Sequence, residues 1–126
     1  MPQARVSRAE LKVIQALWDH GPSSVREVQE TFPEKHRPAY TTVQTLMYRL
    51  EAKNAVKRAK KIGGAHVFEA VVSRNATGRK LVAELLELFG GSAQPVMSQL
   101  IESGKLTLED IEEAQAILRK ATRSDR

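Results

Sequence analysis

The stretch RPAYTTVQTLMYRLEAKN, from Arg37 to Asn54, decides the fold because it reads as one helix with two unlike faces. Apolar side chains recur along it at positions i, i+3, i+4 and i+7, which is the spacing of one continuous stripe on an α-helix. We therefore expect this stripe to face a core. Its members are Val43, Leu46, Met47 and Leu50.

The face opposite the stripe is polar. At about 3.6 residues per turn, Thr41, Thr45 and Tyr48 lie nearly opposite the stripe, and Gln44 and Arg49 lie on its flanks. Hydroxyl, amide and guanidinium groups are suited to hydrogen bonding in the groove of a nucleic acid. A surface helix without a ligand has the same pattern, so this face alone leaves both interpretations open.

Both ends of this helix carry local signals. Pro38 is expected in the first helical turn, where its missing N–H is no loss. Asn54 is expected to take the left-handed conformation that closes the helix.

Two shorter helices are predicted before the helix at 37–54. Each begins with an S-x-x-E capping box, SRAE at Ser7 and SVRE at Ser24, and they end at Gly21 and Pro33. Two short capped helices followed by a longer one with a polar outer face are typical of a helix-turn-helix, in which the third helix reads the DNA. The expected inward side chains are Leu11, Ile14, Leu17 and Trp18 in the first helix and Val25, Val28 and Phe32 in the second.

The helical period disappears after Asn54, where VKRAKKIGGAHVFEA begins at Val56. The Gly63-Gly64 pair separates two short runs, 56–61 and 66–70, which predicts a two-stranded hairpin. Four cations crowd its first strand, and we interpret the hairpin as a wing that contacts phosphates beside the reading helix. The alternative is a solvated edge whose lysines only block aggregation. These cations are Lys57, Arg58, Lys60 and Lys61.

The polar segment 71–78 is the expected boundary between two lobes, 1–72 and 73–126, and three helices are predicted beyond it. Thr107 is expected to cap the last of them, with Asp110 at its third position. The second lobe has too few residues, and its apolar stripes are too wide, for it to close a good core alone. Its helices therefore need a partner surface. One possible partner surface is the first lobe. The other is the same set of helices in a second subunit, and the charge-neutral composition of the second lobe favours this pairing.

The net positive charge of the chain comes entirely from the first lobe. Residues 1–72 hold 12 Lys and Arg against 7 Asp and Glu, whereas residues 73–126 hold 8 of each. A sequence pI near 9.7 with the excess on one lobe is typical of a nucleic-acid binder, although a basic surface without a ligand gives the same balance.

No catalytic or metal-binding pattern stands out. The chain has no cysteine, which excludes disulfides and thiolate chemistry, and His20, His36 and His66 are isolated from one another. The Gly63-Gly64 pair lacks the setting of a phosphate-binding loop. We therefore expect no enzyme activity, no metal and no cofactor. Because no signal segment or long apolar run is present, we expect a cytoplasmic protein without membrane insertion.

The residues described so far resemble the BlaI/MecI/CopY family of bacterial winged-helix repressors, the penicillinase-repressor group. The most specific matches are SRAELKVIQALWDHGPSSVREV at 7–28, AYTTVQTLMYRLEAKN at 39–54 and SGKLTLEDIEEAQAIL at 103–118. The resemblance implies a winged helix that binds operator DNA and C-terminal helices that form a homodimer. It also implies that Thr42, Gln44, Thr45 and Arg49 lie at the DNA and that Lys60 and Lys61 lie at its backbone.

The sequence departs from this family at two points. Copper-responsive members bind metal through C-terminal cysteines, and this chain has none. Antibiotic-responsive members are cut at an Asn-Phe bond by a membrane-sensor protease, and the matching positions here are Gln99 and Leu100. The resemblance therefore leaves the inducing signal unassigned, with a sensor protease as an open partner.

The whole sequence predicts a mainly α fold with a small β-hairpin: a winged helix-turn-helix lobe that binds DNA and a C-terminal three-helix lobe that dimerises. We expect a homodimeric transcriptional repressor on a palindromic, double-stranded operator. The expected DNA-binding residues are Arg37, Tyr40, Thr41, Thr42, Gln44, Thr45, Tyr48, Arg49, Lys57, Arg58, Lys60, Lys61 and His66. The expected dimerisation residues are Leu81, Leu85, Phe89, Val96, Leu100, Ile111 and Leu118.

The alternative from a different class is a winged helix that serves as a protein-interaction module and docks an acidic partner without sequence-specific DNA binding. The outward face of the reading helix argues against it, since Tyr48 is its only aromatic or aliphatic anchor. A repressor gated by a small apolar ligand in the helical lobe would differ only in its signal.

Overall fold

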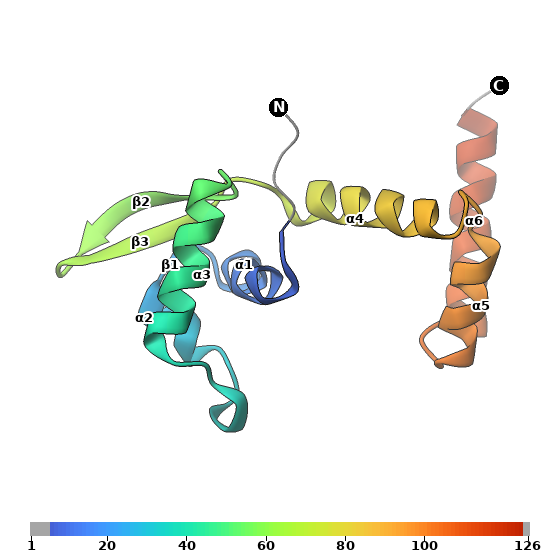
Figure 1. The fold of residues 1–126 in the computed structure, drawn as a ribbon. Helices are drawn as coiled ribbons and strands as arrows, with labels where there is room; N and C mark the ends of the chain where they lie inside the picture. The colour runs from blue at the N-terminus through green and yellow to red at the C-terminus, as the bar shows by residue number, and fades with distance from the viewer. Residues whose placement is uncertain (1–5, 125–126) are drawn as a thin grey trace. The chain divides into compact units, whose positions relative to one another are not determined.

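The computed structural model describes residues 6–124, in which six α-helices, a short 3-10 helix and three short strands follow one another (Figure 1). The fold class is therefore the predicted one, mainly helical with a small sheet. The outer ends of the two predicted lobes, residues 1–5 and 125–126, lie outside the described residues. By its contacts the chain divides into two compact units, the first ending at Gly78 and the second beginning at Arg79.

The first two helices begin as their capping boxes predict. Helix α1, Arg8–His20, starts after Ser7, whose hydroxyl accepts from the Glu10 amide at 3.1 Å while its own amide donates to the Glu10 carboxylate at 2.7 Å. Helix α2, Val25–Glu30, starts after Ser24 with the same pair of bonds to Glu27. Each box satisfies backbone donors that the first turn of a helix leaves unpaired.

Helix α3 spans Tyr40–Ala52 and begins later than expected. The prediction that Pro38 lies in its first turn is wrong, because Pro38 precedes the extended N-cap residue Ala39. A 3-10 helix, η1 at Glu34–His36, fills the connection instead, and the Gln29 side chain donates to the Pro38 carbonyl at 3.1 Å. The other end agrees with the prediction, since Asn54 has a φ of 62° directly after the last turn.

The predicted hairpin is present as β2, Val56–Ile62, and β3, Ala65–Ala70. A third strand, β1 at Ser23–Ser24, pairs with β3, so the antiparallel order is β1-β3-β2. The strand β1 was not predicted, because two residues are too few to show an alternating pattern. A bulge interrupts the β2–β3 register between Arg58 and Lys60.

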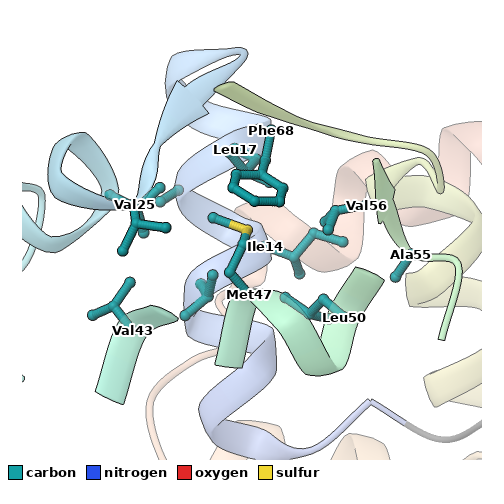
Figure 2. Packing of buried hydrophobic residues seen from close by; sticks show 12 residues of the cluster. Ile14, Leu17, Val25, Val43, Met47, Leu50, Ala55, Val56 and Phe68 are labelled. Carbon is teal, nitrogen blue, oxygen red and sulfur yellow. The ribbon is translucent and has the colours of Figure 1, made fainter. Parts of the chain in front are cut away.

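The core of the first unit forms where α3, α1 and the hairpin meet (Figure 2). Val43, Met47 and Leu50 of the predicted stripe are completely buried, and Leu46 packs at the edge. Phe68 of β3 covers the same cluster from the sheet side. Each fully buried side chain of this size contributes about 1.5–3 kcal/mol through lost contact with water, so the stripe firmly sets the rotation of α3. The α1 and α2 contributors are Val13, Ile14, Ala16, Leu17, Val25 and Val28.

A buried ion pair ties the start of α1 to the end of α3. The Lys53 ammonium lies 2.5 Å from a carboxylate oxygen of Glu10, which is only 1% exposed. Burial alone would raise the pKa of the Glu10 carboxyl, but hydrogen bonds from Lys53 and Ser7 and the charge of Lys53 outweigh it and lower the pKa. The carboxylate therefore stays charged in the folded protein.

The boundary between the two units falls within helix α4, Arg74–Leu88. The second unit also contains α5, Gln94–Glu102, and α6, Leu108–Ser124. Segment 71–78, the expected boundary between the lobes, is helical from Arg74 onward, because the Ser73 hydroxyl accepts from the Ala76 amide at 3.0 Å and so caps α4. The predicted cap of α6 is confirmed by reciprocal bonds between Thr107 and Asp110. Across residues 6–124, no helix has the length and apolarity needed to cross a membrane.

The Glu10→Ala variant is expected to lower the free energy of unfolding of the first unit by about 2–3 kcal/mol, because it removes a cap contact and leaves Lys53 without its buried carboxylate. The matched variant Glu27→Ala removes only a cap contact and should cost about 0.5–1 kcal/mol. Urea unfolding followed by the fluorescence of Trp18, the single tryptophan, measures both.

The difference between the Glu10→Ala variant and the wild type should also depend on pH. Because the folded state lowers the Glu10 pKa, its stabilisation is complete above the ordinary value of 4.5 and is lost as the pH falls through the lower folded pKa. The gap in stability should therefore shrink in acid. Equal losses in the two variants, or a gap that widens in acid, would contradict the assignment of the ion pair.

Candidate nucleic-acid interface

One side of the outward face of α3 carries three threonines and an arginine. Thr41, Thr42, Thr45 and Arg49 are all exposed, and together with Leu46 they line a shallow hollow of about 300 Å³. The Thr45 hydroxyl donates to the Thr41 carbonyl at 2.9 Å. Within the described residues, the Arg49 guanidinium has no ion-pair or hydrogen-bond partner, so its donors are available to a ligand.

The other side of α3 faces a larger hollow of about 380 Å³ between α2, α3 and β3. Four predicted DNA-binding residues meet here, namely Tyr40, Gln44, Tyr48 and His66. The Gln44 amide donates to the Tyr48 hydroxyl at 3.2 Å, which orients both groups. The remaining lining residues are Ser24, Val25, Arg26, Gly64, Ala65 and Phe68.

Arg26 is a candidate interface residue that was not predicted from the sequence. Its guanidinium lies 5.4 Å from the centroid of the Tyr40 ring, a cation–π distance, and it lines the larger hollow. In the sequence Arg26 is one exposed cation on a short helix, and only the approach of α2 to the start of α3 gives it these neighbours. No local pattern could have indicated that.

The four cations of the hairpin have different environments. Lys60 and Lys61 are exposed and have no ion-pair partner in the described part of the chain. Lys57 instead pairs with Glu69 of the neighbouring strand at 3.3 Å. The bulge contributes to this difference, since Arg58 lies opposite Phe68 whereas Lys60 lies opposite Val67 and so projects from the other face of the hairpin.

Arg58 is held by contacts within the protein. Its Nε and Nη2 donate to the two carboxylate oxygens of Glu51 at 2.9 and 3.3 Å, and its guanidinium lies 5.4 Å from the ring centroids of both Tyr48 and Phe68. The hydrogen bond to Glu51 is the main cause that raises the pKa of the guanidinium above its already high value. Arg58 of β2 is thus joined to α3 on one side and to β3 on the other.

Arg37 is likewise engaged by the backbone. Its guanidinium donates to the Phe32 carbonyl at 3.0 and 3.1 Å and to the Glu30 carbonyl at 3.1 Å. These carbonyls lie at the end of α2, where the helix leaves its last acceptors unpaired. The structure therefore places Arg37 at the connection between α2 and α3, with most of its donors in use.

The predicted dimerisation residues lie on helices whose apolar faces are open to solvent. Leu81, Leu85, Leu100 and Leu118 are exposed, and Phe89, Val96 and Ile111 are partly buried. Not one side chain described from residue 79 to residue 123 is buried. The candidate cleavage residues Gln99 and Leu100 lie inside α5 and are exposed.

The geometry of the first unit defines a class of protein. A helix with a polar outward face packs on α1, which is equally long, and on the shorter α2, and a hairpin that carries the exposed Lys60 and Lys61 flanks it. This is the arrangement of a winged helix-turn-helix. No cluster of His, Asp and Glu in residues 6–124 could hold a metal ion. The polar groups and cations on this surface suit a nucleic acid, whose acceptors and phosphates they complement.

Within this class, residues 6–120 match the model of the penicillinase repressor family, and the chain belongs to that family. It is therefore a DNA-binding transcriptional repressor rather than an enzyme. The expected family, fold class and absence of enzyme activity agree with this finding.

Solved structures include two similar chains. One is BpsR of Bordetella bronchiseptica, whose DNA binding is regulated by 6-hydroxynicotinic acid, with 22% identity, coverage of 98% of this chain and 79% of that chain, and a TM-score of 0.47. The other is the transcriptional regulator Tm0710 of Thermotoga maritima, with 20% identity, coverage of 94% and 80%, and a TM-score of 0.48. No curated protein matches the sequence.

The Arg37→Ala variant is expected to lower the free energy of unfolding by about 1–2 kcal/mol, because it leaves the carbonyls of Glu30 and Phe32 without a charged donor. Lys35→Ala removes a nearby exposed cation with no partner in the described residues, and it should change stability by less than about 0.5 kcal/mol. Urea unfolding followed by Trp18 fluorescence distinguishes the two. Equal stability of both variants would show that the Arg37 bonds contribute nothing in solution.

Proposed function

We propose that this protein represses transcription as a homodimer bound to a palindromic operator, with α3 of each protomer in the major groove. The observation that carries the proposal is the outward face of α3, where Arg49 and three threonines are exposed while the opposite stripe is buried. Such a helix presents hydrogen-bonding groups to base edges while its core contacts hold its rotation fixed.

In this proposal discrimination between sequences comes from α3. Arg49 is suited to a guanine, which offers two acceptors in the major groove, and Gln44 is suited to an adenine, which offers a donor and an acceptor. Thr41, Thr42 and Thr45 supply hydroxyls along the same groove. Each good bidentate contact is worth about 1–3 kcal/mol against the wrong base.

The hairpin contributes affinity that does not depend on sequence. Lys60 and Lys61 are exposed at its outer part, and a cation that neutralises a phosphate releases condensed counterions. Each such contact adds about −0.9 to the slope of the logarithm of the binding constant against the logarithm of the salt concentration. Arg26, Tyr40, Tyr48 and His66 border the same surface and are suited to further contacts with the sugar-phosphate backbone.

Dimerisation is supported by the apolar faces of the second unit. In a single protomer Leu88, Leu108, Ile117 and Leu118 are 77%, 74%, 70% and 67% exposed, an arrangement that a stable soluble protein covers with a partner. Because each protomer carries the same faces, a two-fold interface buries them mutually. Two reading helices would then address half-sites spaced by about one helical turn of DNA or a multiple of it.

Arg49→Ala should lower affinity for the preferred sequence by about 1–3 kcal/mol per half-site and leave binding to unrelated DNA nearly unchanged, because it removes a base contact. Lys60→Ala should weaken binding to every sequence alike and reduce the steepness of the salt slope by about 0.9 per protomer. Titrations of a preferred fragment and its single-base-pair variants at several salt concentrations measure both. If both variants lose only salt-dependent, sequence-blind affinity, α3 is not the reading helix.

The Leu118→Glu variant should shift the protein from dimer to monomer, because it places a carboxylate in the apolar face of α6. Ala116→Glu adds the same carboxylate on roughly the opposite side of that helix and should leave the dimer intact. Sedimentation velocity measures the molar mass of both variants, and Trp18 fluorescence checks that the first unit stays folded. A wild-type monomer, or a dimer that survives in Leu118→Glu, would refute this interface.

A further inference from the structure

Arg58 connects the two elements to which DNA binding is assigned. It starts from β2 of the hairpin, and both of its bonded nitrogens end on Glu51 of α3. A guanidinium held by both oxygens of one carboxylate has a defined orientation, unlike a solvated lysine. Stacking on Tyr48 and Phe68 at 5.4 Å adds contacts on its faces.

The same contacts extend along the reading face. The Tyr48 ring lies 6.4 Å from Phe68, and its hydroxyl accepts from Gln44 at 3.2 Å. A chain of contacts therefore runs from the hairpin through Arg58 and Tyr48 to Gln44, which is a proposed base contact. In the described residues, no other cation of the hairpin has an ion-pair partner on α3, because Lys57 pairs within the hairpin and Lys60 and Lys61 are unpaired.

We propose that Arg58 is a positioning residue that locks the hairpin against α3, and that Glu51 is its essential partner rather than an adverse charge beside the DNA. This inference rests on the proposed function, because it assigns the hairpin and α3 to one DNA-binding surface. It replaces the expectation that Arg58 contacts a phosphate. Using Arg58 for a phosphate would require breaking its pair and would leave the Glu51 carboxylate next to the anionic backbone.

The two roles predict opposite effects of neutralising Glu51. If Arg58 contacts a phosphate, Glu51→Gln removes a competing anion and should raise DNA affinity. If Arg58 positions the hairpin, Glu51→Gln releases the lock and should lower affinity despite the loss of a negative charge. The matched control is Glu69→Gln, which removes the same charge from a pair that stays within the hairpin.

A charge-conserving change at Arg58 gives a second, independent contrast. Lysine keeps the positive charge but lacks the planar fork that holds both oxygens of Glu51. For a positioning residue, Arg58→Lys should lower affinity as Glu51→Gln does, whereas a phosphate contact should survive this change. Lys35→Arg is the matched conservative change at an exposed cation that has no partner in the described residues and is not assigned to the DNA-binding surface.

We expect Glu51→Gln and Arg58→Lys each to lower affinity for the preferred DNA by about three- to tenfold, which corresponds to the coupling typical of neighbouring residues in one network. Glu69→Gln and Lys35→Arg should not lower it. In an Arg58→Gln background, Glu51→Gln should instead raise affinity, because Glu51 has lost its partner there. Equilibrium titration of the full-length protein at constant salt measures all of these, with urea unfolding to confirm that each variant is folded.

Higher affinity in Glu51→Gln, or unchanged affinity in Arg58→Lys, would overturn the positioning role. Hydrogen exchange of the free protein keeps this test separate from the proposed function. The amides of β2 and β3 should exchange faster in Glu51→Gln than in Glu69→Gln, and equal rates would also overturn the role. If the wild type binds no preferred sequence, the proposed function fails, while the exchange comparison still decides whether Arg58 locks the hairpin.

Discussion

Burial of one helical stripe determines which side chains of this protein face outward. Val43, Met47 and Leu50 of α3 are completely enclosed by α1, α2 and the hairpin, so α3 cannot rotate about its axis without exposing them. The polar residues between them are thereby held on the opposite face. Discrimination among DNA sequences requires such fixed donors, since a helix that rotates presents no constant pattern to base edges.

The remaining contacts of the first unit hold this helix at its ends and beside the sheet. The Glu10–Lys53 pair fixes the end of α3 to α1, Arg37 closes the connection before its start, and Arg58 joins its outer face to the hairpin. These three cations of the basic lobe, like Lys57 in its pair with Glu69, therefore act on the protein itself. Counting positive charges overestimates the number available to DNA. The better guide is the set of cations that have no partner within residues 6–124, such as Arg49, Lys60 and Lys61.

Much of this arrangement could be predicted from the sequence because its signals are local. The capping boxes at Ser7 and Ser24, the stripe of α3 and the left-handed Asn54 each depend on residues a few positions apart. The strand β1, the early start of α4 and the late start of α3 were missed, since they depend on pairing or on capping inside a polar segment. The engagement of Arg58 also follows from tertiary contact, because Glu51 and Phe68 reach it only after the hairpin folds onto α3.

The proposed function depends on the reading of a specific DNA sequence by a two-fold pair of these lobes. Its most direct test is retention of genomic DNA fragments by the full-length protein at two salt concentrations, followed by sequencing of the retained fragments. We expect an enriched inverted repeat that survives the higher salt, because base contacts persist when counterion release weakens. Retention that is blind to sequence and vanishes at the higher salt would contradict it and would favour a basic module that docks an acidic protein.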